Sequence, residues 1–157
     1  MKGNIMDNDE VIATLNELIE TCMDGEASYA RCAMEAAERQ SKLQTMFSDL
    51  QHGCGAAATA LQDIVRAAGG KPRLDSSVSS AVHRGWISLK TTIAGGNDEA
   101  VLVECERGED AALKKYSDAL KKDLPPAIRA IVERQYAGVQ INHFQIKTLR
   151  DQLKVAV

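Results

Sequence analysis

Apolar residues recur at helical spacing along four long segments of this chain, and that periodicity constrains the fold more than any other feature. The first stripe follows a capping residue, Asn8 or Asp9, and persists for about 30 residues, longer than a typical globular helix. A stripe of this length predicts a helix that packs along most of a bundle. Its apolar members are Val11, Ile12, Leu15, Leu18, Ile19, Cys22, Tyr29, Ala30, Ala33 and Ala37.

Three further helices are predicted in the same way. Ser41 and Gln44 have the spacing of a capping box, and the apolar face that follows continues to about residue 68, where Gly69 and Gly70 end it. The third helix is predicted over 98–121, after a cap at Asn97. The fourth begins at two prolines, which a first helical turn tolerates well, and extends to about residue 153.

The connection between the second and third helices, residues 71–97, is long and begins as a polar loop. Residues 81–95 predict a short helix with Trp86 on its apolar face. A crossover of this length can run the length of a bundle, so the second and third helices are predicted to be parallel neighbours, as in ferritin-like bundles. We therefore predict an all-α four-helix bundle, with a flexible tail over residues 1–7 and a single domain over residues 8–157.

Composition narrows the classes of function. The net charge is −3 and no basic stripe occurs, which argues against binding to nucleic acid. No apolar run reaches the roughly 20 residues of a membrane span, and the N-terminus has no signal-peptide core, so a cytoplasmic protein is predicted. The four cysteines match no zinc-binding spacing and are interpreted as reduced, core-filling thiols.

Two glutamates fall inside apolar stripes. A rotation of about 100° per residue places Glu26 in the middle of the first stripe and Glu109 in the middle of the third, with Glu106 at its edge. The heights of Glu26 and Glu109 along their helices both correspond to the middle of the bundle. The other acids of that part of the third helix are predicted to face solvent: Glu104 and Asp110.

Facing carboxylates in an apolar core are costly unless a metal, a shared proton or hydrogen-bond donors satisfy them. A metal would give an arrangement that resembles a di-metal carboxylate site. A shared proton or hydrogen-bond donors would leave neutral or hydrogen-bonded glutamates. The side chains predicted to be within reach as hydrogen-bond partners are Tyr29, Tyr116, Tyr136, Gln135 and His143.

Di-metal bundles take one glutamate from each of two helices and a Glu-x-x-His pair from each of the others. The fourth helix offers Gln140-x-x-His143, with His143 inside its stripe and Gln140 at the flank. The second helix contains Asp49-x-x-His52, but His52 falls on the outer face. The candidate ligands for iron or manganese are therefore Glu26, Glu106, Glu109, Gln140 and His143.

Four motifs in order resemble a family of small bacterial four-helix-bundle proteins that is placed among ferritin-like proteins and has no assigned function. They are NDEVIATLNELIETCMDGEASY, HRGWISLK, ECERGEDAALKKY and DLPPAIRAIVERQYAGVQINH. The resemblance implies a ferritin-like fold in a bacterial, cytoplasmic setting. The broader ferritin-like class implies di-iron chemistry at Glu26, at Glu106 or Glu109, and at Gln140 or His143, whereas the inner face of the second helix carries no ligand.

These observations favour a non-enzymatic bundle with a degenerate core carboxylate site. We predict that it self-associates, with a dimer favoured, or binds a partner or small ligand. A stress-related role would suit the ferritin-like resemblance. The alternative hypothesis is a metal-dependent oxidase or iron-handling protein built around Glu26 and Glu109.

Overall fold

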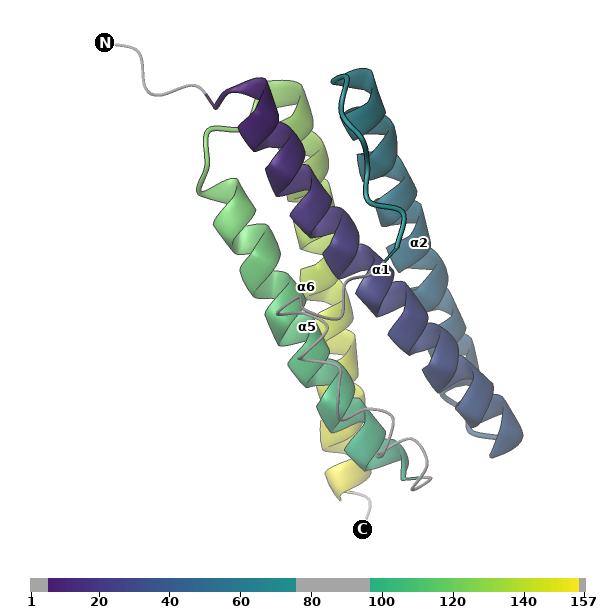
Figure 1. Cartoon of the computed structure of the whole chain (residues 1–157). Helices are drawn as coiled ribbons and strands as arrows, with labels where there is room; N and C mark the ends of the chain where they lie inside the picture. The colour runs from purple at the N-terminus through teal and green to yellow at the C-terminus, as the bar shows by residue number, and fades with distance from the viewer. Residues whose placement is uncertain (1–5, 76–96, 156–157) are drawn as a thin grey trace.

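The computed structural model describes residues 6–75 and 97–155, which form four helices (Figure 1). They are α1 (Asn8–Glu38), α2 (Gln44–Ala67), α5 (Asp98–Leu120) and α6 (Pro126–Val155). No strand occurs in these two ranges. The prediction of an all-α four-helix fold is therefore confirmed. The short helix predicted over 81–95 lies outside the described residues.

The helices form two antiparallel hairpins, α1 with α2 and α5 with α6, and α2 and α5 run in the same direction (Figure 1). The second and third helices are thus parallel, as predicted. The prediction that they are neighbours is wrong, because α1 packs on α5 and α2 packs on α6. The long connection allows this placement, in which every pair of adjacent helices is antiparallel.

The start of α1 is fixed by a residue that precedes the predicted caps. Asp7 is the N-cap, and its Oδ1 accepts a hydrogen bond from the Glu10 amide at 2.8 Å. The side chain of Asn8 instead donates to the carbonyl of Ala68, which ties the beginning of α1 to the end of α2. At that end Gly69 has φ +85°, the left-handed conformation that the predicted stop requires.

The predicted capping box of α2 does not form. Ser41 donates from its Oγ to Asp98 Oδ2 at 2.8 Å, and Arg39 pairs with the other oxygen of Asp98 at 2.9 Å. Ser41 therefore joins the first hairpin to the start of α5, and α2 begins at Gln44 without a side-chain cap. Asn97, predicted to cap the third helix, does so by accepting from the Ala100 amide.

The core consists of two clusters, one toward each end of the bundle. One contains Leu15, Leu61, Tyr116 and Val132, near the end where α1 begins. The other contains Tyr29, Phe47, Leu102 and Ile146, near the end where α5 begins. The boundary between the clusters lies near mid-height on all four helices, where the predicted glutamates lie.

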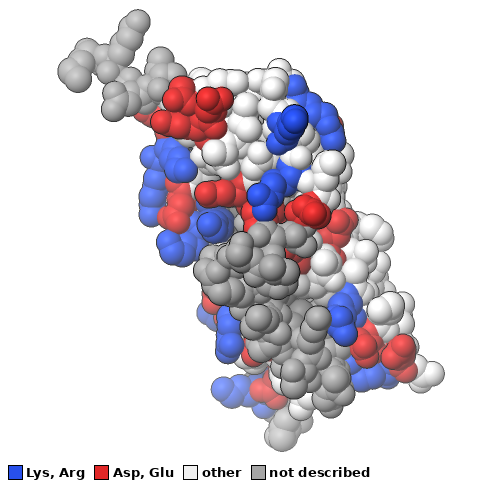
Figure 2. All heavy atoms as spheres, viewed as in Figure 1, with Lys and Arg blue, Asp and Glu red and all other residues white. Residues whose placement is uncertain are grey.

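The surface on the side of α1 and α5 carries acidic and basic side chains in alternation (Figure 2). The first residues of the crossover lie along α1, because Asn16 bonds the backbone of Lys71 and of Arg73. None of the described helices is long and apolar enough to cross a membrane.

Candidate functional site: a cavity at the middle of the bundle

A cavity of about 450 Å³ lies at the boundary between the two core clusters, and all four helices line it. Small side chains create the space: Gly25, Gly53, Ala56, Ala57, Ala112 and Gly138. The polar groups in its wall are Thr21, Cys22, Cys54, Glu109, Tyr116, Gln135 and Asn142. Its volume is within the range of small-molecule sites, which are typically mostly apolar with a few polar groups that fix orientation.

The cavity opens between α2 and α6. Gly53 and Ala56 of α2 are exposed, and Gly138 of α6 is half-buried. A methyl group added to Gly53 or Gly138 would meet no other atom within 4 Å. A smaller hollow of about 160 Å³ shares Gly53 and Asn142 with the cavity and extends it along the same groove.

Glu109 is the buried acid of the cavity wall, with 4% of the residue exposed. The hydroxyl of Tyr29 donates to its Oε1 at 2.5 Å, and the Tyr29 ring stacks on Phe47. Burial raises the pKa of Glu109 from 4.5 to about 7, against the lowering effect of the Tyr29 hydrogen bond, and the charge of Asp110 raises it further. Glu109 therefore changes charge near neutral pH.

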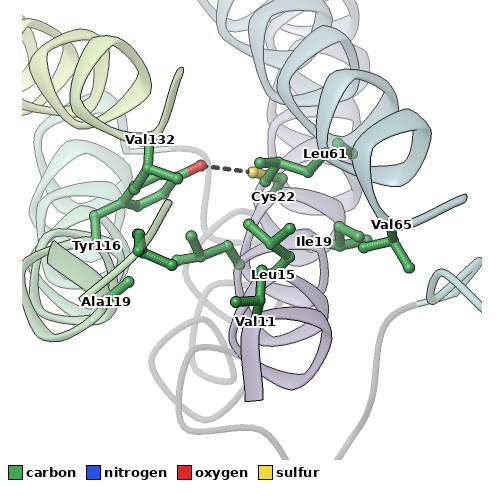
Figure 3. Close-up of a cluster of buried hydrophobic side chains, with 12 residues drawn as sticks. Val11, Leu15, Ile19, Cys22, Leu61, Val65, Tyr116, Ala119 and Val132 are labelled. Atoms are coloured by element: carbon green, nitrogen blue, oxygen red, sulfur yellow. Dashed lines mark hydrogen bonds between the residues drawn. The ribbon is translucent and has the colours of Figure 1, made fainter. Parts of the chain in front are cut away.

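A second polar chain crosses the cavity from α1 to α6. The Tyr116 hydroxyl lies 3.0 Å from the sulfur of Cys22 (Figure 3). It also donates to Gln135 Oε1 at 2.8 Å. Gln135 in turn donates to the carbonyl of Ala57 on α2. Three helix contacts are thus fixed by hydrogen bonds beside the apolar wall, which favours a preformed site.

The thiols of the site are poor nucleophiles. Burial raises the pKa of Cys22 to about 12 and that of Cys54 well above 9.0, and nearby acids add to both effects. The thiolate is the reactive form of cysteine. Cys32 and Cys105 are also buried as free thiols, with their sulfurs 4.0 Å apart outside the cavity.

Glu26 and Gln140 were both predicted as ligands, and neither is among the residues that line the cavity. The carboxylate of Glu26 packs over Gly55 of α2, where a Cβ atom would come within 2.2 Å of its Oε2. Gln140 is exposed on α6. The two carboxylates predicted to face each other have different immediate neighbours, Gly55 for Glu26 and the Tyr29 hydroxyl for Glu109. Both charges act on the thiols of Cys22 and Cys54.

Glu106 and His143 do meet, on the outer side of α5 and α6. His143 Nε2 lies 2.7 Å from Asp110 Oδ1 and 3.9 Å from Glu106 Oε1, and Arg150 pairs with Glu106. In the part of the chain that the structure describes, one group of three potential metal ligands lies within 4.8 Å: Glu106, Asp110 and His143. We call these three residues the outer cluster.

The rotation of about 100° per residue gave an incomplete account of two acids of α5. Asp110 faces solvent as predicted, with 62% of its side chain exposed, yet it bonds His143. Glu104 was predicted to face solvent, but only 13% of its side chain is exposed and it pairs with Arg107. A helical wheel considers one helix alone, so it cannot register what packs on the flanks. The i,i+4 spacing of Glu106 and Asp110 was the available signal for the outer cluster.

The described residues do not fit a bridged di-metal site in the core. Such a site needs several carboxylates with oxygens converging on one point. Glu26 and Glu109 are held by different neighbours, and the inner face of α2 presents Leu50, Cys54 and Leu61 there. His52, the one imidazole of α2, is exposed as predicted.

A family described as a domain of unknown function (DUF2383) matches residues 10–122. The match covers more than half of the chain, so the chain belongs to this family. It extends from α1 to the end of α5 and thus includes Glu109, Tyr29 and the α1, α2 and α5 walls of the cavity. No curated protein matches the chain.

Proposed function

We propose that this member of the DUF2383 family is a non-enzymatic binding protein that holds one small, largely apolar molecule at the middle of its bundle. The observation that carries the proposal is the cavity of about 450 Å³ between the core clusters. Protein interiors are close-packed, and large voids in them are few. A void of this size, open to solvent at one side, would be a costly defect in a protein that bound nothing there.

The chemistry of the wall supports binding over catalysis. The thiols that line it are held in the neutral form, and Tyr116 and Gln135 are hydrogen-bonded within the protein. Among the described residues of the wall, Glu109 is the acid that could exchange a proton with a bound molecule. Hydrogen bonding to Tyr29 fixes its position, which suits recognition of one group on a ligand.

Binding of 1-aminoanthracene, a neutral aromatic dye at pH 7, tests the proposal. Gly138→Leu places a side chain at the cavity where a Cβ meets open space, so the variant should fold and lose the dye signal. Ala137→Leu is the matched control, since Ala137 is exposed on the same helix and does not line the cavity. Equal dye binding by Gly138→Leu and the wild type would contradict the proposal.

A second candidate function is binding of one divalent cation by the outer cluster. The observation that favours it is the convergence of an imidazole and two carboxylates within 4.8 Å. This ligand set suits zinc, iron or manganese. Arg150 competes for Glu106, so binding should be modest and should strengthen in Arg150→Gln.

Calorimetric titration with Zn²⁺ tests this second function. His143→Ala should weaken binding at least about tenfold, as loss of a ligand predicts. His52→Ala is the matched control, because His52 is an exposed histidine of α2 outside the cluster. Identical Zn²⁺ affinity in the wild type and His143→Ala would exclude the outer cluster as the site.

Self-association, predicted from the sequence, remains a proposal supported by apolar surface on α6. Ile141 is 67% exposed and Phe144 is 70% exposed, three residues apart on one face. Light scattering coupled to size exclusion would give the mass in solution. A dimer that Phe144→Ser converts to a monomer is the expected result, and a wild-type monomer at high concentration would contradict it.

A further inference from the structure

We infer that the molecule held in the cavity is an apolar amine whose ammonium group pairs with the carboxylate of Glu109. The inference deepens the proposed binding function and rests on it. The charge of the cavity wall decides which kind of molecule the cavity prefers. The apolar part of the lining sets no preference among neutral, anionic and cationic ligands. The described wall contains one acidic side chain, that of Glu109, and no lysine, arginine or histidine.

A wall with a single carboxylate selects against anions. A fatty acid or a phosphate ester would bring a second negative charge beside the buried carboxylate of Glu109, where like charges repel strongly. No described basic group is available there to offset it. An ammonium group has the opposite effect, since it supplies the counter-charge that a buried carboxylate otherwise lacks.

The entrance to the cavity has the same sign of charge. Asp49 lines the smaller hollow that shares Gly53 and Asn142 with the cavity. A cation that entered along this hollow would pass the exposed carboxylate of Asp49 before it reached Glu109. Negative charge along an approach path raises the local concentration of cations.

The position of Glu109 also fits this role. Tyr29 donates to Oε1, so the carboxylate is held by a neutral group and not by a cation. A lysine or arginine partner would have neutralised Glu109 within the protein and removed its attraction for a ligand. None of the described residues donates a hydrogen bond to the second oxygen, Oε2, which leaves it available for a ligand donor.

The affinity for an amine should also depend on pH, because Glu109 must be ionised to pair with the ammonium group. The titratable groups near Glu109 are Tyr29 and Cys22 of α1, Cys54 of α2, and Asp110, Cys105 and Tyr116 of α5. Glu26 of α1 is a further acid in this region, because its charge acts on the thiols of Cys22 and Cys54. From α6, the wall receives Gln135 and Asn142, which do not titrate. The pKa values of the thiols and phenols are raised, so Glu109 is the group of this set that ionises near neutral pH. Amine affinity should therefore increase as pH rises from 6 to 8.

The test compares three probes of matched shape by calorimetry: 2-phenylethylamine, 2-phenylethanol and 3-phenylpropanoate. The wild type should bind the amine about tenfold more tightly than the alcohol, the difference between a charge-assisted and a neutral hydrogen bond. The anion should bind most weakly. Glu109→Gln keeps the shape of the side chain and an acceptor for Tyr29, and it should bind amine and alcohol equally, without pH dependence.

The outcomes separate the inference from the function on which it rests. If the alcohol binds as tightly as the amine and Gly138→Leu blocks both, the cavity binds ligands but the amine inference is overturned. If an amine preference persists in Glu109→Gln, the inference is also overturned. If Gly138→Leu leaves all binding unchanged, the cavity is not the site and both proposals fail. Circular dichroism melts of each variant confirm that it folds.

Discussion

Glu109 and Glu106 are three residues apart on α5, yet their surroundings differ in kind. Glu109 is inside the bundle and accepts from a neutral phenol, that of Tyr29. Glu106 lies at the boundary of α5 and α6, where the cationic Arg150 pairs with it and His143 lies nearby. The charge of the partner therefore decides what each acid can do. Glu109, with a neutral partner, can still attract a charged ligand, whereas Glu106 is already neutralised by Arg150.

The largest expected effect is a pH-dependent stability that Glu109 confers and Glu106 does not. The pKa of Glu109 is raised on folding, so the folded state binds its proton more tightly than the unfolded state does. Its contribution to stability is greatest below pH 4.5 and is lost as pH rises to about 7. The difference in unfolding free energy between the wild type and Glu109→Gln should therefore change by about 3 kcal/mol over that range.

Urea unfolding at a series of pH values measures this difference. Glu106→Gln is the matched control, because it makes the same change one turn away on α5 and should retain the wild-type loss of stability. A constant difference between the wild type and Glu109→Gln from pH 4.5 to 7 would mean that Glu109 is solvated or paired with a cation.

Removing the neutral partner of Glu109 should have the next largest effect. Tyr29→Phe preserves the buried ring and its stacking on Phe47 but removes the hydrogen bond to the carboxylate. Loss of a buried bond to a charged group should destabilise the protein by about 2 kcal/mol above pH 7. The cost should shrink at pH 5, where Glu109 is protonated. A cost that is the same at both pH values would show that Tyr29 acts through packing alone.

A third acid, Glu26, extends the comparison, because its carboxylate lies against Gly55 of α2 and not against a phenol or an arginine. Gly53→Ala should stabilise α2 by about 1 kcal/mol through helix propensity, since its Cβ meets open space. Gly55→Ala should show little or none of this gain, because the new Cβ would displace the carboxylate of Glu26. Thermal unfolding measures both, and adding Glu26→Ala to Gly55→Ala should restore the gain. Equal gains in both single variants would place Glu26 elsewhere.

The smallest effect is expected from the outer cluster. His143→Ala removes a partner of Asp110 whose side chain is 62% exposed, so the cost should be about 0.5 kcal/mol. High salt should reduce this cost further, as it screens exposed charges. A loss above about 2 kcal/mol would show that the cluster is a structural centre comparable to Glu109 and Tyr29.

The four helices were predictable because they depend on local sequence, and so were the end of α2 and the start of α5. The apolar stripes, Gly69 and Asn97 each act through neighbours a few residues away. The interpretation of Glu109 as a buried acid was also accessible, and Tyr29 was among the partners predicted for it. Local sequence did not show that Ser41 would bond Asp98, since that contact spans the ends of two hairpins.

The cavity and the placement of Glu26 were not predictable from periodicity. A stripe shows which face of a helix is inward, but it does not say which neighbour a side chain meets. Glu26 lies over Gly55 because that residue lacks a side chain. Small residues such as Gly25 and Ala57 are compatible either with close helix contact or with empty space, and only the separation of all four helices decides between them.

The most direct test is a titration of the Glu109 side-chain carboxyl by carbon-13 NMR, with Glu109→Gln to assign the signal. In the free protein the midpoint should be about pH 7. Saturation with 2-phenylethylamine should lower the midpoint, because the ammonium group stabilises the ionised form. A midpoint near the ordinary value of 4.5 that the amine leaves unchanged would contradict both the buried carboxyl and its role in binding.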